Sequence, residues 1–299
     1  MTKTDLLAET KLLLNQHGLH ARKGLAQHFL TDRCVLEKIV EAAELKPDDL
    51  ILEVGPGPGV LTRELVKGAG WVIAVELDDK LAGILKENAA PAVNMTVVNR
   101  DILQVDPGEL IKDLSSTFNV RCLKFKTPNY KVVANLPYYI TSAVLRHFLE
   151  ASMKPEVMVI MVQEEIAQAI TAPAGKMSLL SVSVQFYGKP VVVTHVPKDS
   201  FYPAPKVDSA VLRIDLYPKP VVDVDDPDAF FRLVKAGFKG HRKQLINSLS
   251  RGLNLEKEAV LSLLEKAGID FTRRAQTLTM EEWGRLYLAQ SGHALNETR

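Results

Sequence analysis

The apolar positions of this chain follow two alternating patterns over its first two-thirds. Short apolar runs typical of buried strands occur at residues 50–54, 71–75, 95–98, 130–134 and 158–163. Between them, apolar residues recur every three or four positions, as at residues 32–43, 60–66 and 140–150, which predicts helices. Strands that alternate with helices in this way predict an α/β fold built on a mostly parallel sheet. Residues 179–186 fit a helix or a strand equally well.

The pattern changes after residue 217. Two prolines, Pro218 and Pro220, and an acidic stretch introduce segments with helical periodicity at residues 227–251, 256–267 and 280–290. Gly237 and Gly240 are the points at which the first of these helices could break. We therefore predict an α/β domain over residues 1–217 and a small all-α domain over residues 218–299.

Composition sets limits on the function. The chain has 299 residues, of which 46% are hydrophobic, enough for a substantial core. Its net charge is +1, so a nucleic-acid site must be a local basic patch. Cys34 and Cys122 form no CxxC pair and no metal-ligand spacing, which indicates a reducing compartment and predicts no bound metal. Since neither a leader-like segment nor an apolar run of membrane-spanning length occurs, we expect a cytoplasmic protein with no membrane partner.

The strand at residues 50–54 runs into a glycine turn and then into a helix. The turn is Gly55-Pro56-Gly57-Pro58-Gly59. Glycine admits positive φ and lets a ligand approach the backbone, and the N–H groups at the start of the next helix can face a polar ligand. This succession predicts a nucleotide-binding site at Gly55 and Gly57. The dinucleotide pattern G-x-G-x-x-G would place its third glycine at position 60, one residue later than Gly59.

Two acids follow the next two predicted strands. Glu76 ends the second strand, where a carboxylate can accept hydrogen bonds from both hydroxyls of a ribose. Asp101 and Ile102 follow the third strand, at the edge where open α/β sheets bind ligands, and the Asp101 carboxylate is placed to accept a hydrogen bond from an adenine amine. A helix N-cap is the alternative role for Asp101. These two acids suit NAD as well as S-adenosylmethionine (SAM), so they do not choose between the two cofactors.

The turn after the fourth strand carries the most specific chemistry. It reads NLPYY at residues 135–139 and follows the strand expected beside the glycine turn. The Asn135 side-chain carbonyl and the Leu136 backbone carbonyl can both accept hydrogen bonds from an exocyclic amine. Pro137 stiffens the turn, and Tyr138 offers an aromatic face to a planar base. We predict that these four residues form the catalytic group.

A basic arm precedes the helix at residues 32–43. Its QHFL segment is expected to line the cofactor pocket through Gln27, His28 and Leu30. Arg22 and Lys23 of the same arm are expected to face a polyanion. A solvated N-terminal arm is the simpler alternative for all of these residues.

Two further segments are candidate contacts with a substrate. The loop FYPAPKVDS at residues 201–209 is held extended by two prolines, and Phe201 is either its hydrophobic anchor or a second aromatic face for a base. From residue 232 to residue 251 the charged residues are all Lys or Arg, although the net charge of the whole chain is near zero. This bias predicts a phosphate-binding face made by Lys235, Lys239, Arg242 and Lys243, with a solvated helix face as the alternative.

Four motifs therefore stand in a fixed order: QHFL at 27–30, EVGPGPGVLT at 53–62, NLPYY at 135–139 and FYPAPKVDS at 201–209. In this combination the chain resembles the ribosomal RNA small-subunit adenine dimethyltransferase family (KsgA/RsmA type) from about residue 17 to residue 250. The E-x-G-x-G-x-G opening at Glu53 is the usual one in SAM methyltransferases. The resemblance implies a Rossmann-like class I SAM-dependent methyltransferase domain over residues 1–217 and a helical rRNA-binding domain over residues 218–299.

The resemblance also implies a reaction and a substrate. Methyl groups from SAM would be transferred to N6 of two adjacent adenosines near the 3′ end of 16S rRNA in the 30S subunit, by a monomer that takes part in small-subunit biogenesis. By the same resemblance, Glu76 holds the ribose of the cofactor, Asp101 holds its adenine, and Asn135 lies between cofactor and target. His28, Leu30 and Gly55 contact the cofactor, although the family more often has Asn at the position of His28.

The implied mechanism depends on positioning. A stacked adenine cannot reach a methyl donor, so the base must leave its stack. Tyr138 and Phe201 would stack on it, at about 1–3 kcal/mol per base. Hydrogen bonds from N6 to Asn135 and Leu136 would favour a pyramidal nitrogen whose lone pair faces the methyl group. Such a reaction needs neither a metal nor a covalent nucleophile, and we expect the N6 proton to leave to solvent.

Three other functions fit parts of the sequence. A 23S rRNA adenine methyltransferase of the macrolide-resistance type would share the catalytic turn. An RNA-binding ribosome assembly factor would keep the fold with incidental catalysis. An NAD-dependent oxidoreductase would share the glycine turn and Glu76, but the early third glycine disfavours it and the turn at Asn135 would have no use.

Overall fold

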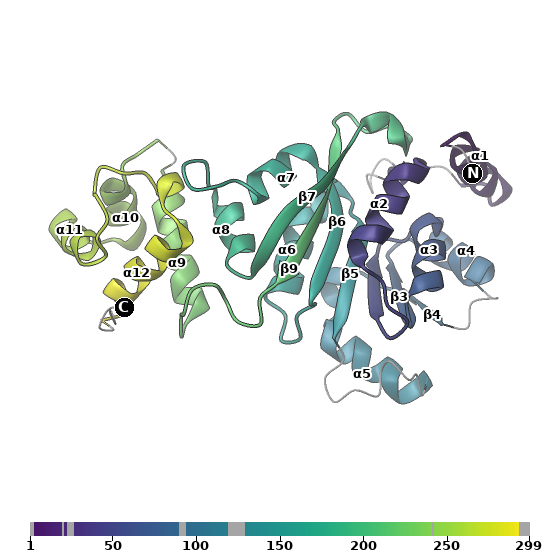
Figure 1. Cartoon of the computed structure of the whole chain (residues 1–299), viewed down its shortest axis with the longest axis horizontal. Coiled ribbons are helices and arrows are strands. Elements are labelled where there is room, and N and C mark those ends of the chain that lie inside the picture. The colour runs from purple at the N-terminus through teal and green to yellow at the C-terminus, as the bar shows by residue number, and fades with distance from the viewer. Residues whose placement is uncertain are drawn as a thin grey trace. The chain divides into compact units, whose positions relative to one another are not determined.

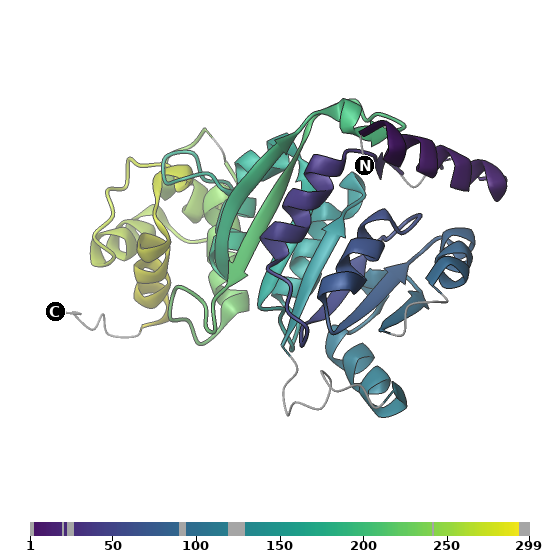
Figure 2. The ribbon, with the colours of Figure 1, turned by 45° about the vertical axis from the view of Figure 1, so that its right-hand side comes forward.

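A computed structural model describes residues 3–19, 21–22, 27–89, 94–118, 129–240 and 242–292. The chain forms two compact units (Figures 1 and 2). The first comprises residues 1–167 and 191–216, and the second comprises residues 168–190 and 217–299. Residues 168–190, which the sequence assigns to the α/β domain, are therefore grouped with the C-terminal helices.

A seven-stranded sheet organises the first unit. Its strands are β2 (Leu50–Val54), β3 (Trp71–Glu76), β4 (Met95–Asn99), β5 (Tyr130–Asn135), β6 (Val157–Gln163), β7 (Gly188–Val196) and β9 (Ser209–Leu216). Their order across the sheet is β4-β3-β2-β5-β6-β9-β7. The strands from β4 to β6 are parallel, and β9 pairs with β6 in the antiparallel sense. The predicted α/β fold is confirmed, and β2 lies beside β5 as expected.

Helices of the first unit precede, connect and follow the parallel strands. They are α1 (Lys3–Gln16), α2 (Arg33–Ala43), α3 (Val60–Gly68), α4 (Asp79–Ala89), α5 (Pro107–Phe118), α6 (Thr141–Leu149) and α7 (Glu164–Ile170), with 3-10 turns η2 (Ile102–Gln104), η4 (Tyr138–Ile140) and η5 (Lys198–Ser200). Figures 1 and 2 show α2 and α3 on one face of the sheet and α6 on the other. Right-handed crossovers produce this arrangement, because the strand order runs one way from β2 to β4 and the other way from β5 to β6.

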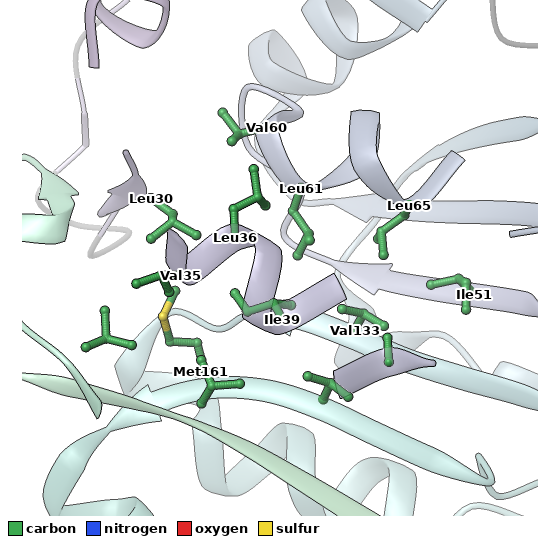
Figure 3. Packing of buried hydrophobic residues seen from close by; sticks show 14 of the residues in the cluster. Leu30, Val35, Leu36, Ile39, Ile51, Val60, Leu61, Leu65, Val133 and Met161 are labelled. Carbon is green, nitrogen blue, oxygen red and sulfur yellow. The ribbon is translucent and has the colours of Figure 1, made fainter. Parts of the chain in front are cut away.

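A hydrophobic cluster lies between α2 and the sheet (Figure 3). Leu36 and Ile39 of α2 are each 1% exposed. They belong to the same cluster as Leu61 of α3 and Val133 and Met161 of the sheet. Burying an aliphatic side chain of this size stabilises the fold by about 1.5–3 kcal/mol. This layer therefore fixes α2 and α3 against the strands that carry the predicted site residues.

A two-stranded ribbon joins two motifs that are distant in the sequence. Strand β1 (Phe29–Leu30) pairs in the antiparallel sense with β8 (Phe201–Tyr202). Phe29 is opposite Tyr202, and Leu30 is opposite Phe201. The QHFL and FYPAPKVDS motifs are therefore parts of one structural element.

A buried lysine lies at the beginning of β5. Lys131 is 4% exposed, and its Nζ donates to the carbonyl oxygens of Ala43 and Glu44 at 3.1 and 2.9 Å and to the Asp49 carboxylate at 2.7 Å. The two carbonyls lie at the end of α2, where a helix leaves carbonyl groups without intrahelical partners. One cation thus connects α2, β5 and the turn before β2.

The second unit is helical. Its elements are α8 (Leu179–Gln185), α9 (Pro227–Phe238), α10 (Leu245–Leu253), α11 (Lys257–Lys266), the 3-10 turn η6 (Ala275–Thr277) and α12 (Met280–Ser291). The ambiguous residues 179–186 form helix α8 because Ser178 and Ser181 make a reciprocal cap at its start. Phe186 after this helix stacks on Phe230 of α9, with ring centroids 4.8 Å apart.

The prediction of one helix over residues 227–251 is wrong, because the first helix of this segment is shorter. It ends at Phe238 and resumes as α10 at Leu245, whose N–H donates to the Arg273 carbonyl at 2.7 Å. Gly240 lies in this break, whereas Gly237 lies inside α9. A Cβ on Gly237 would be 2.5 Å from the Trp283 ring, so this glycine allows α12 to pack closely rather than breaking the helix.

Candidate active site

The carboxyl ends of the parallel strands surround a cavity of about 310 Å³. All the residues predicted to bind a cofactor line it: Gln27, His28, Leu30, Gly55, Gly57, Glu76, Asp101, Ile102 and Asn135. The remaining catalytic candidates, Leu136, Pro137 and Tyr138, line it as well. The fold thus brings together predicted residues from separate segments, because the ends of parallel strands meet at one edge of the sheet.

The glycine turn presents its backbone to this cavity. Gly55, Gly57 and Gly59 have φ values of 66°, 56° and 85°, which glycine adopts without strain. A Cβ on Gly57 would lie 3.2 Å from the Phe29 ring, so the turn and β1 are close together. At Gly55 the nearest atom to an added Cβ would be Pro137 Cδ, at 3.9 Å. A ligand can therefore approach the backbone at Gly55.

Glu76 is a buried acid at the end of β3. It is 6% exposed, and its carboxylate accepts hydrogen bonds from the N–H groups of Gly57 at 3.0 Å and Asp78 at 2.9 Å. Burial raises the pKa of Glu76, and these backbone hydrogen bonds oppose the increase. Because a carboxylate has about four lone-pair positions, Glu76 can also accept hydrogen bonds from the hydroxyls of a ligand.

Both roles considered for Asp101 are compatible with the structure. Its Oδ1 accepts a hydrogen bond from the Leu103 N–H at 3.0 Å, so Asp101 is the N-cap of η2. It also lines the cavity beside the buried Ile102. A carboxylate that uses one acceptor position in a cap keeps others for a ligand.

The turn after β5 is held in place by hydrogen bonds. The Asn135 Nδ2 donates to the His28 carbonyl oxygen at 3.0 Å, and the Leu136 N–H donates to the Met161 carbonyl oxygen at 3.3 Å. Only the amide nitrogen of Asn135 can donate to a carbonyl, which fixes the orientation of its side chain. The Asn135 Oδ1 is consequently the atom that can accept a hydrogen bond from a ligand.

Tyr138 is held at both its hydroxyl and its ring. The hydroxyl is hydrogen-bonded to Ser209 Oγ at 2.7 Å, and burial raises the pKa of Tyr138. The ring stacks against His28, with centroids 5.9 Å apart and 24° between the planes. His28 Nδ1 is 2.7 Å from the Pro203 carbonyl oxygen, to which it must donate. The sequence did not identify Ser209 as a site residue, because it is 71 positions from Tyr138 and no local pattern links the two.

Phe201 does not line the cavity, contrary to the base-stacking prediction. It is 4% exposed and belongs to the hydrophobic cluster beside α2. Side chains alternate along a strand, so the pairing of β8 with β1 directs Phe201 inward and leaves its neighbour Tyr202 36% exposed. Phe201 is therefore the hydrophobic anchor of its loop.

The predicted basic contacts have different surroundings. Arg22 forms an ion pair with Asp78, with Nη1 and Oδ2 3.2 Å apart, while half of its side chain stays exposed. Asp78, which the sequence did not single out, is buried and also accepts a hydrogen bond from Gln27 at 3.4 Å. Lys23 lies outside the described residues. In the second unit the exposed basic residues include Lys235, Lys239, Arg242 and Lys243.

Comparison with known proteins identifies the family. A family model described as ribosomal RNA adenine dimethylase matches residues 18–287. The chain belongs to the ribosomal RNA adenine dimethylase family. A relative from Dehalococcoides mccartyi, ribosomal RNA small subunit methyltransferase A, is 50% identical over 97% of this dimethylase and 95% of the relative. The protein of the same name from Moorella thermoacetica is 44% identical over 92% of this chain and 94% of its own.

Two solved structures resemble the dimethylase over most of its length. The 23S rRNA methyltransferase ErmE has a TM-score of 0.68 and 31% identity, covering 88% of this chain and 99% of ErmE. A dimethyladenosine transferase from Plasmodium falciparum has a TM-score of 0.73 and 23% identity, covering 89% and 99%, and supports the fold. The protein is thus a SAM-dependent rRNA adenine methyltransferase with a Rossmann-like domain, as its motifs predicted, and not an NAD-dependent oxidoreductase.

The cavity of the dimethylase fits SAM. The backbone at Gly55 is accessible from the cavity. The cavity also contains a buried acid, Glu53, which belongs to a sequence motif but was not predicted to be a site residue. Glu53 is 1% exposed and lines the cavity, and its Oε2 has no hydrogen-bond partner among the described residues. An unpartnered buried carboxyl oxygen is costly unless a ligand supplies a donor. An adenosine that carries an ammonium-bearing tail has such a donor.

Glu53 gives the stability of the dimethylase a pH dependence. Burial raises the pKa of Glu53 from 4.5 to about 8, with the Thr62 hydroxyl opposing the increase and the Glu76 carboxylate adding to it. Between pH 4.5 and about pH 8 the unfolded chain has lost the Glu53 proton that the folded protein retains. The contribution of Glu53 to the free energy of unfolding is therefore complete below pH 4.5 and disappears as the pH rises to about 8. We expect Glu53→Gln to stabilise the protein by roughly 4 kcal/mol near pH 7.5 relative to the wild type, and by much less near pH 5. Urea unfolding at both pH values tests this, and a difference that is the same at both would contradict it.

The described residues show neither a metal cluster nor a membrane helix. No three His, Cys, Asp or Glu side chains among them are arranged to hold a metal ion. None of the described helices is long and apolar enough to cross a membrane. Cys34 is an exposed free thiol, and Cys122 lies outside the described part of the chain.

Proposed function

We propose that this dimethylase transfers methyl groups from SAM to N6 of two adjacent adenosines near the 3′ end of 16S rRNA, within the 30S subunit or its precursor. The observation that carries the proposal is the turn from Asn135 to Tyr138 at the cavity. There an oriented amide oxygen, a backbone carbonyl and a fixed aromatic ring adjoin an accessible glycine backbone. Relatives up to 50% identical are named for the small ribosomal subunit, which favours 16S rRNA.

The cavity residues divide the binding of SAM among them. SAM supplies a methyl group on a sulfonium, which is a good leaving group. The backbone at Gly55 and Gly57 would adjoin its methionine end, Glu76 would accept hydrogen bonds from its ribose, and Asp101 would accept one from its adenine amine. His28 and Leu30 complete the lining on the β1 side. These groups need no metal ion for the reaction.

The chain presents the target nitrogen to the methyl group. A flipped adenine stacks on the face of the Tyr138 ring opposite His28, which contributes about 1–3 kcal/mol. The Asn135 Oδ1 and the Leu136 carbonyl accept hydrogen bonds from N6, so that its lone pair turns out of the ring plane and towards the methyl group. This is catalysis by positioning. The proton that N6 loses passes to solvent.

The exposed basic residues of the second unit are proposed to hold rRNA phosphates. We expect the double variant Lys235→Glu, Lys239→Glu to bind 30S subunits about 10-fold more weakly and to reduce the salt dependence of binding by about one unit of slope per lost phosphate contact. The rate at saturating substrate should stay near that of the wild type. Filter binding over a salt series measures both effects, with the exposed Lys257→Glu of α11 as control. An unchanged slope would rule out phosphate contacts at these two lysines.

We also propose that the enzyme works as a monomer in the cytoplasm, where ribosomal subunits assemble. A small-subunit substrate requires this location. Size-exclusion chromatography with light scattering measures the oligomeric state, and a stable dimer would contradict the proposal.

The substrate is tested with labelled methyl groups. Transfer from SAM is measured on undermethylated 30S subunits and, side by side, on 23S rRNA, with nucleoside analysis of the products. N6,N6-dimethyladenosine in the 30S reaction alone supports the proposal. Methylation of 23S rRNA alone would contradict it and favour the alternative that the likeness to ErmE raises. SAM binding without transfer to either RNA would favour an assembly factor.

A further inference from the structure

Among the described residues, two large hydrophobic side chains that line the cavity are also exposed to solvent. Leu77 follows Glu76 at the end of β3 and is 47% exposed, and Tyr139 lies in the turn after β5 and is 58% exposed. Strand β2 lies between β3 and β5. Leu77 is therefore on the side of the cavity proposed for the ribose and adenine of SAM, whereas Tyr139 is on the side proposed for the methyl acceptor.

The two tyrosines of this turn have different surroundings. The Tyr138 hydroxyl is hydrogen-bonded to Ser209, and its ring stacks against His28. Within the described part of the chain, the Tyr139 side chain has no hydrogen bond and no ring contact, and more than half of it faces solvent. Tyr139 is thus an aromatic ring at the mouth of the cavity that the fold itself does not use, and its face is available to a ligand.

The backbone fixes the directions of the two rings. Tyr138 and Tyr139 both belong to η4, in which the Ile140 N–H donates to the Pro137 carbonyl oxygen at 3.1 Å. A 3-10 turn has three residues per turn, so its consecutive side chains diverge by about 120°. The Tyr138 ring is directed to the contacts that hold it, and the Tyr139 ring is directed elsewhere, to solvent. One base cannot stack on both rings.

The proposed substrate supplies a second base. When an adenine leaves its stack, the bases on either side of it lose a stacking partner. Proteins that bind single-stranded RNA replace such partners with aromatic side chains, which stack on successive bases. Because the two proposed target adenosines are adjacent, the base in the cavity always has a neighbouring adenine.

We propose that Tyr139 stacks on the base next to the target adenine and so holds the rRNA strand at the mouth of the cavity. The inference rests on the proposed function in taking an RNA base as the methyl acceptor. When one of the two adenosines is in the cavity, the other is the neighbour that stacks on Tyr139. Tyr139 is therefore a substrate-binding residue, and it has no part in the transfer of the methyl group.

Steady-state methylation of undermethylated 30S subunits by full-length variants tests this contact. We expect Tyr139→Ala to raise the KM for 30S subunits about 10-fold, and Tyr139→Phe, which keeps the ring, to stay within about 2-fold of the wild type. The kcat and the affinity for S-adenosylhomocysteine should change by less than about 2-fold in both variants, because only substrate binding is affected. Tyr202→Ala is the matched control, since Tyr202 is an exposed tyrosine that does not line the cavity.

A series of altered substrates identifies the base. The 30S subunits are reconstituted with rRNA whose synthetic 3′ segment keeps one target adenosine, and the nucleotide before or after it either has a base or lacks it. For the wild type, removal of the base on one side should raise the KM about 10-fold. For Tyr139→Ala the same removal should leave the KM unchanged, because the contact is already lost.

The inference and the proposed function can fail separately. An unchanged KM for Tyr139→Ala, a rise that phenylalanine does not prevent, an equal rise for Tyr202→Ala, or equal effects of base removal on wild type and Tyr139→Ala at both positions would each overturn the inference and leave the substrate in place. If the wild type methylates 23S rRNA instead of 30S subunits, the proposed substrate fails. The same variants are then compared on 23S rRNA, where a rise in KM for Tyr139→Ala alone would support the inference and an unchanged KM would overturn it.

Discussion

Replacing Asn135 with alanine is expected to lower the rate of methyl transfer by about 100-fold or more, with little change in the affinity for SAM. The side chain is oriented by its 3.0 Å hydrogen bond to the His28 carbonyl, which leaves its Oδ1 to accept from N6. Without that acceptor N6 stays conjugated with the ring, and its lone pair does not face the methyl group. The contacts proposed between the cofactor and Glu76 and Asp101 do not involve this side chain and should persist.

The experiment compares Asn135→Ala with a substitution at the other end of the same strand. Asn129 is exposed immediately before β5, so Asn129→Ala should transfer methyl groups as the wild type does. Single-turnover transfer to undermethylated 30S subunits gives the rate, and calorimetry with S-adenosylhomocysteine gives the affinity. A rate for Asn135→Ala within 10-fold of the wild type would show that the Asn135 side chain is not a principal contact of N6.

Replacing Lys131 with methionine is expected to cost about 3–5 kcal/mol of the free energy of unfolding, although the residue is far from the cavity along β5. The substitution removes the charge and shortens the unbranched side chain by only one atom. It leaves the Asp49 carboxylate without its cation and the carbonyl oxygens of Ala43 and Glu44 without their donor. Uncompensated buried charge is more costly than the loss of an exposed ion pair.

Urea unfolding followed by circular dichroism measures this loss. Lys86→Met on α4 is the control, because Lys86 is exposed and its substitution should change stability by less than about 0.5 kcal/mol. The affinity of the folded Lys131→Met variant for S-adenosylhomocysteine should match the wild type. A loss of stability no larger than that of the control would show that the buried contacts of Lys131 do not stabilise the fold.

The residues of the cavity could be predicted from the sequence because they lie at equivalent positions, at the ends of successive parallel strands. Gly55, Gly57, Glu76, Asp101 and Asn135 each follow a predicted strand, and parallel strands end at one edge of a sheet. Periodicity located those strands, and the chemistry of each residue type suggested a role. The order of the four motifs then identified the family, which the comparisons confirm.

Local patterns could not show which side chains meet across the fold. The sequence left Phe201 as either a stacking partner or an anchor, and the pairing of β8 with β1 decided for the anchor. Ser209 and the carbonyl of Pro203 hold Tyr138 and His28 in place, but both lie far along the chain from the residues they contact. Their contacts depend on the pairing of distant strands, which periodicity does not encode.

Helix boundaries in the second unit and the state of Glu53 were also decided by tertiary structure. The helix breaks before Leu245, whose N–H donates a hydrogen bond to the Arg273 carbonyl. Helix α8 groups with α9, and Phe186 and Phe230 stack between them. Glu53 was visible in the sequence as the first residue of a motif. Only the structure shows that its Oε2 is buried, unpartnered among the described residues and beside Glu76. The residue types and their spacing thus determined the fold class and the chemistry, whereas burial and pairing between distant segments decided which side chains are free to bind.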